Sequence, residues 1–307
     1  MRLLTSGLAV LALTHTAVGA APQAGLTRTV FASVLAKDGT PVTDLAAADF
    51  DVREGGKPQA ITSVTRAPMP LRVHVIVSDG GTGAFQLGVL RLAQALADHG
   101  EFALTSVVVQ SQRILEFTAS PQLFGEAIQK LGRRGTGQGR HQLMDAIGGA
   151  LKDIAAPGKH GVLIVLRVGD EEASTQSAAP VREALRQSGA TMYVVSRTGA
   201  SKAAPTYAGV NSMSAEAVQR QMDDSELADT SLQLNLVLGD GSRDSGGYSQ
   251  ETALTSGVPT LERLAAEING QYAITYTLPA DAKPSDRVQI TTTRKNVTVH
   301  APGRLPN

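Results

Sequence analysis

The sequence predicts an α/β protein with a doubly wound, mostly parallel sheet, and two observations carry this prediction. Beyond residue 70, segments with the pattern of strands alternate with segments of helical spacing, as they do in βαβ units. Leu71 to Val77 is an almost unbroken apolar run, which is typical of a strand buried on both faces. Phe85 to Ala97 then carries leucine and alanine at helical spacing. This alternation predicts helices on both faces of the sheet.

The same alternation continues to residue 196. Strands are expected at 104–109 and 113–117. The next helix is expected to begin at Ser120-Pro121, because a hydroxyl cap followed by proline is typical of a helix start. The later segments of this series are a helix at 142–154, a strand at 162–166, a helix at 180–187 and a strand at 192–196.

Before this domain, residues 27–67 predict a small antiparallel β unit. A β-rich segment is followed by the turn Lys37-Asp38-Gly39-Thr40, which is of the Asp-Gly hairpin kind. Two further strands are expected around Phe50 to Arg53 and Ile61 to Val64. Pro68-Met69-Pro70 marks the end of the unit, because two prolines one residue apart stop regular strand pairing.

After the α/β series, residues 198–256 are rich in Ser, Gly, Ala, Gln and Asp and predict a polar insertion in which only 232–238 looks ordered. An amphipathic helix is expected at 259–268 and ends at Asn269-Gly270. The strand after it can complete the parallel sheet, so the α/β domain is expected to span 71–278. Residues 286–303 predict a C-terminal β-hairpin.

The first twenty residues have the pattern of a signal peptide. A positive start at Arg2 precedes an apolar segment, and small residues from Ala17 to Ala20 suit a signal peptidase that cleaves after Ala20. The apolar segment is shorter than the roughly 20 residues that a bilayer span needs. We therefore expect an exported protein, periplasmic or extracellular, with no transmembrane segment in the mature chain. The sequence has no cysteine, so its stability is expected to rest on packed apolar surface.

The charge balance argues against a nucleic-acid partner. Lys and Arg number 28, as do Asp and Glu, and no long block of one sign occurs. Aromatic residues make up only 4% of the chain and tryptophan is absent, which argues against a surface that stacks bases or sugars.

Several stretches together resemble the von Willebrand factor A-related domain of secreted bacterial proteins. The lead-in Lys37 to Leu45, the stretch Asp49 to Glu54 and the closing stretch Gln271 to Pro279 are similar to that family in order and spacing. The resemblance implies a Rossmann-like fold that serves in binding. It also implies a divalent-cation site in the loops at the carboxyl ends of the strands, built from two aspartates, two hydroxyls and a threonine.

Most of those ligands are missing here, so the metal site is expected to be degenerate. Asp79 keeps the first aspartate, but Gly81 and Gly83 stand at the two serine positions. His141 stands at the threonine position, and imidazole is a poor ligand for Mg²⁺. Val168 stands at the last aspartate, although a shift of two residues would offer Asp170.

Three hypotheses follow. The favoured one is a metal-free site, with no cofactor, that binds an unidentified protein partner outside the cytoplasm through loops 78–83, 135–141 and 168–174. Its expected contact residues are Asp79, Gly81, Thr82, Gly83, Arg140, His141 and Asp170. In the second hypothesis Asp79, Thr82, His141 and Asp170 form a rearranged site for Zn²⁺ or Mn²⁺. In the third, Asp79 only caps the following helix and His141 is an exposed loop residue.

An extracytoplasmic hydrolase is the alternative class. No Gly-x-Ser-x-Gly motif occurs, and Ser249 lies in the polar insertion without the strand-turn-helix context of an activated nucleophile. Asp170-Glu171-Glu172 is a run of adjacent carboxylates, which is more typical of a solvated loop than of an acid-base pair. His74 is expected to be a core residue, whereas His160 is expected beside a turn. We therefore expect a non-catalytic module.

Overall fold

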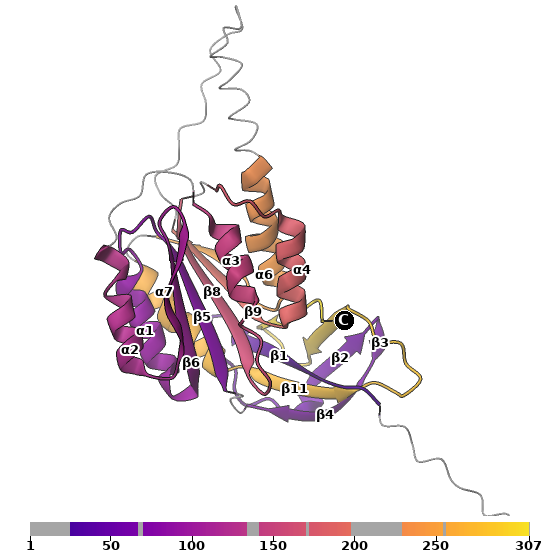
Figure 1. Ribbon diagram of the computed structural model, residues 1–307. Coiled ribbons are helices and arrows are strands. Elements are labelled where there is room, and N and C mark those ends of the chain that lie inside the picture. Colours follow the sequence, from indigo (N-terminus) through magenta and orange to yellow (C-terminus); the bar gives the residue numbers. More distant parts are fainter. Residues whose placement is uncertain are drawn as a thin grey trace, which may run out of the picture.

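The computed structural model of the chain describes residues 25–66, 70–133, 141–169, 172–197, 229–253 and 256–306. These residues form an α/β domain and a β unit that packs against one end of it (Figure 1). The expected signal peptide lies outside the described residues. In the part of the chain that is described, no helix has the length and apolar character needed to cross a membrane.

A six-stranded sheet forms the centre of the α/β domain. From edge to edge its strands are β10 (Ser249–Thr252), β9 (Thr191–Arg197), β8 (His160–Val168), β5 (Leu71–Ser78), β6 (Gly100–Val107) and β7 (Ser111–Thr118). All neighbouring strands are parallel except β6 and β7, which are antiparallel. The first strand lies inside the sheet and the chain extends it on both sides, which confirms the predicted doubly wound fold.

Helices cover both faces of this sheet, as the apolar strands require. One face is covered by α1 (Gln86–Leu96), α2 (Pro121–Ile128) and α7 (Gly257–Asn269). The other is covered by α3 (Leu143–Leu151), α4 (Ala178–Ser188) and the helical segment 229–244, which includes the π-helix η4 (Leu236–Gly241) and α6 (Ser242–Asp244). Short 3-10 turns follow α1 and α2, namely η2 (Ala97–His99) and η3 (Leu131–Arg133).

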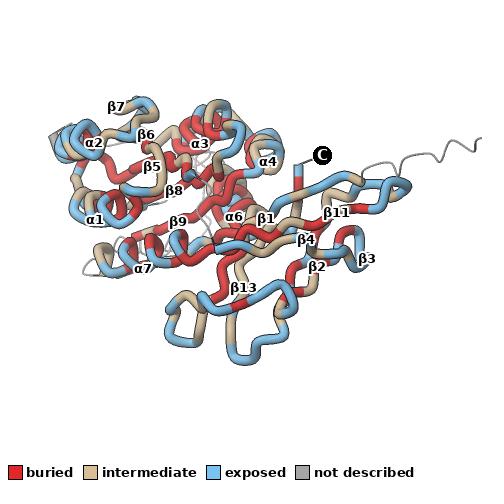
Figure 2. The backbone as a smooth tube through the Cα atoms, turned by 90° about the horizontal axis from the view of Figure 1, so that it is seen from below, coloured by how far each residue is buried: buried red, intermediate tan, exposed pale blue. Residues whose placement is uncertain are grey.

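Side chains of the central strands alternate between these two cores. In β5, Val75 and Val77 face α1 and α7, whereas Ile76 faces α3. Both sets are fully buried, which explains why the sequence of this strand is apolar without interruption. Figure 2 shows buried backbone along β5 and β8 and exposed backbone on the outer sides of the helices.

The β unit consists of two small antiparallel sheets that enclose a third core. One contains β13 (Val297–His300), β1 (Thr27–Ala36), β11 (Tyr272–Thr277) and β4 (Ala60–Thr65). The other contains β12 (Val288–Thr292), β2 (Phe50–Glu54) and β3 (Lys57–Pro58), with the turn η1 (Ala47–Asp49) ahead of β2. The core between the sheets holds Val30, Val34, Phe50, Ile274 and Ile290.

Two expectations about the C-terminal strands are wrong. Strand β11 does not complete the parallel sheet but pairs antiparallel with β1 and β4. Residues 286–303 do not form a hairpin, because β12 pairs with β2 whereas β13 pairs with β1. In β11, buried Tyr272, Ile274 and Tyr276 alternate with residues that are less buried on average, the pattern of a strand with one core face. The units 27–67 and 286–303 are therefore parts of one fold.

The expected insertion 198–256 is more ordered at its C-terminal end than its composition predicts. The helical segment from residue 229 packs Leu234, Val237 and Leu238 into the core beside α4. Strand β10 then extends the sheet at its edge, although its sequence Ser-Gln-Glu-Thr is polar. Residues 198–228 lie outside the described part of the chain.

The β unit packs against the amino-terminal ends of the parallel strands. The Phe31 ring of β1 stacks on the ring of His160, the first residue of β8, with centroids 3.7 Å apart and an angle of 25° between the planes. His300 of β13 contacts Glu267 near the end of α7, with Nδ1 and Oε1 2.8 Å apart. The carboxyl ends of the strands therefore lie at the end of the domain away from the β unit (Figure 1).

Candidate functional site

The described parts of the predicted site loops meet at the carboxyl ends of β5 and β8, which are neighbours in the sheet. We call this end of the domain the carboxyl edge. It comprises the β5–α1 loop 79–85, the β6–β7 turn 108–110, residues 141–142, residues 169 and 172–177 between β8 and α4, and the helix start at 229–233. Most of the expected loop 135–141 and residues 170–171 lie outside the described residues, and with them the expected contact residues Arg140 and Asp170.

Asp79 stabilises the loop in which it lies. Its side chain is almost fully buried, with 3% of the residue exposed. Oδ1 accepts a hydrogen bond from the Gly81 amide at 3.0 Å, and Oδ2 accepts one from the Ala84 amide at 2.8 Å. Both carboxylate oxygens therefore bond to the turn that leads into α1. The N-cap of this helix is Phe85, without a side-chain capping bond, so the hypothesis that Asp79 caps the helix is wrong.

The glycines of this loop have a backbone conformation that disfavours serine. The φ angles are +64° at Gly80, +81° at Gly81 and +73° at Gly83, a region that residues with a Cβ rarely adopt. Thr82 is exposed, and its Oγ1 donates to the Asp79 carbonyl at 3.0 Å. A serine at position 81 or 83 would therefore have a strained backbone in this loop.

His141 is held between the loops. Its Nδ1 and the Ser78 Oγ share a hydrogen bond of 2.9 Å, which joins this residue to the end of β5. Its carbonyl accepts from the Ala173 amide at 2.9 Å, and its backbone forms a parallel bridge with Glu172. His141 is half-buried, so the expectation of an exposed loop residue is wrong.

Glu172 is the main residue of this site that sequence reasoning missed. It was expected in a solvated loop but is 1% exposed. Its Oε1 accepts from the Ser174 amide at 2.8 Å and its Oε2 from the Leu143 amide at 3.3 Å. Burial raises the pKa of this carboxyl above its usual value, while the hydrogen bonds to Ser174 oppose that rise.

Asp145 fastens the same loop from the first turn of α3. Its carboxylate accepts from the Thr175 amide at 3.0 Å and the Gln176 amide at 3.1 Å. In return, Ser174 Oγ accepts from the Asp145 amide at 3.0 Å. Hydrogen bonds in both directions therefore join the β8–α4 loop to the start of α3. An acidic residue in a first helical turn was the one sequence signal for this contact.

Two arginines at the ends of β8 and β9 also brace the carboxyl edge. Arg167 Nε donates to the Gly169 carbonyl at 2.8 Å, and Arg197 Nη1 donates to the Ala84 carbonyl at 3.0 Å. The Arg197 guanidinium also lies 5.6 Å from the centre of the Phe85 ring. Both arginines are buried.

The described donor set does not fit the Mg²⁺ site that the family resemblance implies. Asp79 uses both oxygens on amides, Thr82 donates to backbone, and His141 offers an imidazole rather than a hydroxyl. Among the described residues, no group of three His, Asp or Glu side chains is placed to hold a metal ion. The arrangement can present a surface whose loops are held by buried hydrogen bonds.

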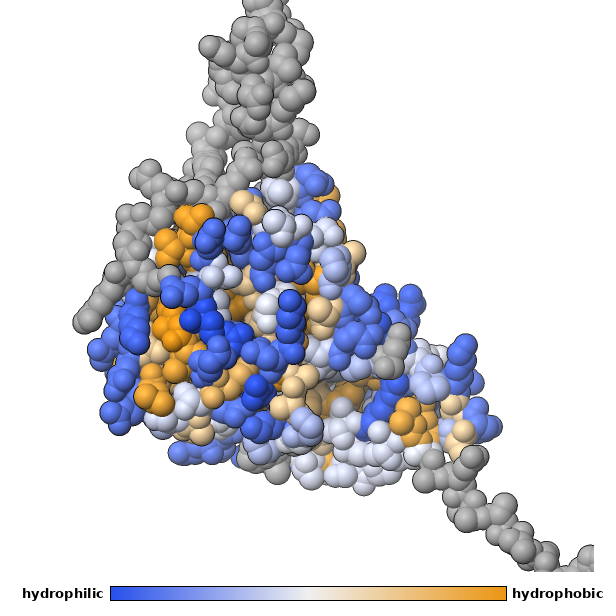
Figure 3. Space-filling model, in the orientation of Figure 1, coloured by the Kyte–Doolittle hydropathy of each residue, from blue (hydrophilic) through white to orange (hydrophobic). Residues whose placement is uncertain are grey.

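Exposed apolar side chains surround this braced surface. Leu87 in the first turn of α1 is 56% exposed, Val109 in the β6–β7 turn 40%, and Leu232 57%. The Val109 carbonyl accepts from the Gln142 amide, and Gln233 Oε1 accepts from the Ala178 amide, so these segments adjoin the site loops. Figure 3 shows apolar side chains at the upper end of the domain, over the tops of β6 and β7.

No family model matches the chain, and no curated protein matches it in sequence. Solved structures with a distant likeness include a von Willebrand factor type A protein from Catenulispora acidiphila, at 12% identity and TM-score 0.43, covering 92% of this chain and 74% of that one. The SpRpn10 VWA domain matches at 10% identity and TM-score 0.37, covering 62% of this chain and 95% of the domain.

Proximal thread matrix protein 1 from the mussel byssus matches at 10% identity and TM-score 0.40 over 66% of this chain. This chain spans about half of that protein's length, 48%. These values describe a distant likeness of backbone only. The strand order and helix placement of the α/β domain are those of the doubly wound, Rossmann-like fold that the sequence resemblance to von Willebrand factor A-related domains implies.

Proposed function

We propose that this chain is an exported, non-catalytic module that binds another protein through its carboxyl edge. The observation that carries the proposal is the combination of exposed apolar side chains, Leu87, Val109 and Leu232, with loops whose shape is fixed by buried polar groups. Interfaces gain most from apolar anchors on a surface that is already ordered before binding.

The loop hydrogen bonds support preorganisation rather than catalysis. Asp79 and Glu172 each accept two backbone amides, so these carboxylates are engaged in holding loops. Ser249, the nucleophile considered for a hydrolase, begins edge strand β10 rather than lying at the turn from a strand into a helix. A hydrolase therefore has less support than a binding surface.

Export is part of the proposal and rests on the signal-peptide pattern of residues 1–20. Export predicts that a signal peptidase removes about twenty residues from the N-terminus when the protein is produced in its native organism. Mass spectrometry of the periplasmic and culture fractions would reveal a mature N-terminus at or near Ala21. An intact Met1 in the cytoplasmic fraction would contradict export.

Site-specific photocrosslinking tests the binding surface. A photoreactive phenylalanine analogue is introduced separately at Leu87 and Val109, and at exposed Lys57 of the β unit as the control. The same crosslinked protein species is expected from the first two positions and not from the third. Crosslinking that is equal at all three positions, or strongest at Lys57, would refute the carboxyl edge as the binding surface.

Charge-reversal variants provide an independent test of the binding surface. Arg140→Glu and Asp170→Arg are expected to weaken the crosslinked complex while the melting temperature of the free protein stays unchanged. Crosslinking is repeated with EDTA, because loss of the complex in EDTA would show that the rearranged metal site is real. Unchanged yields in both charge variants would argue against these two loops.

A further inference from the structure

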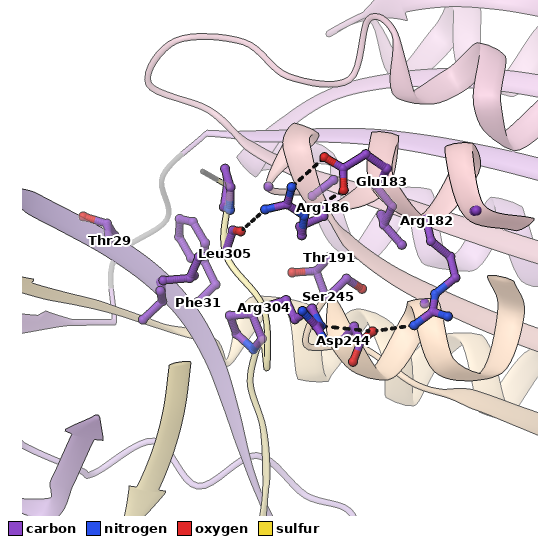
Figure 4. A pocket seen from close by; sticks show the side chains of 18 residues that line it. Thr29, Phe31, Arg182, Glu183, Arg186, Thr191, Asp244, Ser245, Arg304 and Leu305 are labelled. Carbon is purple, nitrogen blue, oxygen red and sulfur yellow. Dashed lines mark hydrogen bonds and ion pairs between the residues drawn. The ribbon is translucent and has the colours of Figure 1, made fainter. Parts of the chain in front are cut away.

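A cavity of about 370 Å³ lies at the other end of α4, between the α/β domain and the β unit. It is bounded by α4, α6, strand β1 and the C-terminal residues 302–306 (Figure 4). Its volume is within the range of about 300–1,000 Å³ typical of small-molecule sites, which often lie at domain junctions. The cavity is remote from the carboxyl edge and independent of the binding proposed there.

Apolar side chains with accessible surface line part of the cavity. Among them are Pro302, which is half-buried, and Pro306, which is exposed, both in the C-terminal segment. Phe31 also lines it, with one face of its ring stacked on His160. This wall suits the apolar body of a ligand rather than a fully polar one.

The rim carries guanidinium groups with unequal hydrogen bonding. All three nitrogens of Arg186 donate: Nε and Nη2 donate to Glu183 at 2.9 and 2.5 Å, and Nη1 donates to the Leu305 carbonyl at 3.1 Å. Arg182 donates only through Nη2, to Asp244 at 2.9 Å. Arg304 donates through Nη1 to Asp286 at 2.6 Å, with its Nε 4.0 Å from Asp244. These are their contacts with described side chains.

Arg182 and Arg304 therefore keep N–H donors that the described residues do not use. Each guanidinium has five such donors. Their side chains are 34% and 40% exposed, and in Figure 4 they flank Asp244 at the cavity. The charges of Arg182, Arg304, Asp244 and Asp286 balance, so selectivity for an anion depends on these unused donors rather than on net charge.

We propose that this cavity binds a small monocarboxylate with an apolar body. Its carboxylate accepts hydrogen bonds from Arg182 and Arg304, and its apolar part contacts Phe31, Pro302 and Pro306. Arginine suits this role because its planar group binds carboxylates through two parallel hydrogen bonds. Because Arg304 belongs to the C-terminal segment, a bound carboxylate would also hold that segment against α4.

Isothermal titration of the mature chain with matched probes tests the proposal. Octanoate and 3-phenylpropionate are compared with octylamine and 3-phenylpropylamine, which have the same apolar parts and the opposite charge, all below micelle-forming concentrations. Saturable binding of at least one carboxylate, tighter than its amine, is expected. Tighter binding of the amines, or no saturable binding of either carboxylate, would overturn the proposal.

Two variants and one control locate the bound probe. Arg182→Gln and Arg304→Gln are each expected to weaken the carboxylate about tenfold, the effect of losing one charge-assisted hydrogen bond. Arg91→Gln on the exposed side of α1 is the matched control and should bind as the parent does. Equal affinity in all three variants would place the probe elsewhere and overturn the assignment.

Hydrogen exchange of the unmodified chain gives a readout that does not depend on how the variants fold. The Leu305 amide donates to the Asp286 carbonyl at 2.7 Å, and the Arg304 amide to the Asp244 carbonyl at 3.2 Å. The carboxylate probe is expected to slow exchange of these amides by several-fold. Unchanged exchange at saturating probe would contradict binding in this cavity.

Discussion

Ser78 and His141 are joined by a hydrogen bond of 2.9 Å between Ser78 Oγ and His141 Nδ1, which links the last residue of β5 to the segment before α3. The imidazole thus stands at the position for which the sequence resemblance implies a threonine ligand, but here it joins two segments to each other. Because the same residue accepts the Ala173 amide, three segments of the carboxyl edge converge on His141.

The first prediction concerns metal. Removal of divalent ions with EDTA is expected to leave the melting temperature of the mature chain unchanged, because Asp79 and His141 are engaged in loop hydrogen bonds. Added Zn²⁺ or Mn²⁺ is likewise expected to produce no saturable heat in titration calorimetry. A stoichiometric ion found by elemental analysis, together with a lower melting temperature in EDTA, would favour the rearranged site instead.

The second prediction concerns the buried carboxylate. Glu172→Ala removes the acceptor of the Leu143 and Ser174 amides and is expected to lower the free energy of unfolding by about 2 kcal/mol, the cost of buried donors left unpaired. Urea unfolding at pH 7 measures this. Glu126→Ala, at an exposed position of α2, is the control and should change stability little. Equal effects of the two substitutions would show that Glu172 does not brace the loop.

The third prediction concerns the glycine loop. Gly81→Ser introduces a hydroxyl at a position for which the sequence resemblance implies a serine ligand, but the φ of +81° is expected to make it cost about 1–2 kcal/mol of stability. Gly149→Ser, at an exposed helical position with open space for a Cβ, is the matched control and should be neutral or slightly stabilising. A Gly81→Ser variant as stable as the parent would mean that the loop readily adopts another shape.

The sequence predicted the α/β domain well because its signals are local. Apolar runs such as Leu71 to Val77 mark strands buried on both faces, and Ser120-Pro121 marks a helix start; the structure has both. The turn at Gly39 was also confirmed, with a φ of +82°. His74 was expected in the core and is fully buried.

Pairing between distant strands could not be predicted in this way. Which sheet receives β11 or β12 depends on partners more than 200 residues away. The sequence hints at a strand with one core face only through the alternation of Tyr272, Ile274 and Tyr276 with smaller or polar residues. The burial of Glu172 was equally hidden, because a carboxylate becomes buried only when another segment supplies amide donors. His160 likewise became a buried residue by stacking on Phe31 of β1.

The fourth prediction concerns pH. Burial lowers the pKa of His74 and of His160 from 6.5 to about 3, so both stay neutral in the folded protein where the unfolded chain takes up a proton. Their contribution to stability is therefore complete above about pH 6.5 and is lost as the pH falls from there toward 3. On the order of 2 kcal/mol per histidine should be lost between pH 6.5 and 5.

Urea unfolding of the parent and of His74→Gln at these two pH values measures this loss. The variant is expected to be less stable at neutral pH, since it disturbs a buried contact between His74 Nε2 and Thr105 Oγ1 of 2.8 Å, but to lose less stability on acidification. His99→Gln, at a half-buried position outside the strand, is the control and should follow the parent. The same pH dependence in all three proteins would contradict the lowered pKa of His74.

The fifth prediction concerns the boundary between the units. A fragment of residues 71–278, which the sequence alone marks as a domain, is expected not to unfold cooperatively. It would keep β11 but lose β1 and β4, the two strands that pair with it among the described residues, and it would expose His160 by removing Phe31. Residues 25–306, which retain both units, should melt as the mature chain does. Thermal unfolding followed by circular dichroism compares the two. A cooperative transition of the fragment near the melting temperature of the mature chain would show that the α/β domain folds without the β unit, and that pairing of β11 with β1 and β4 adds little to its stability.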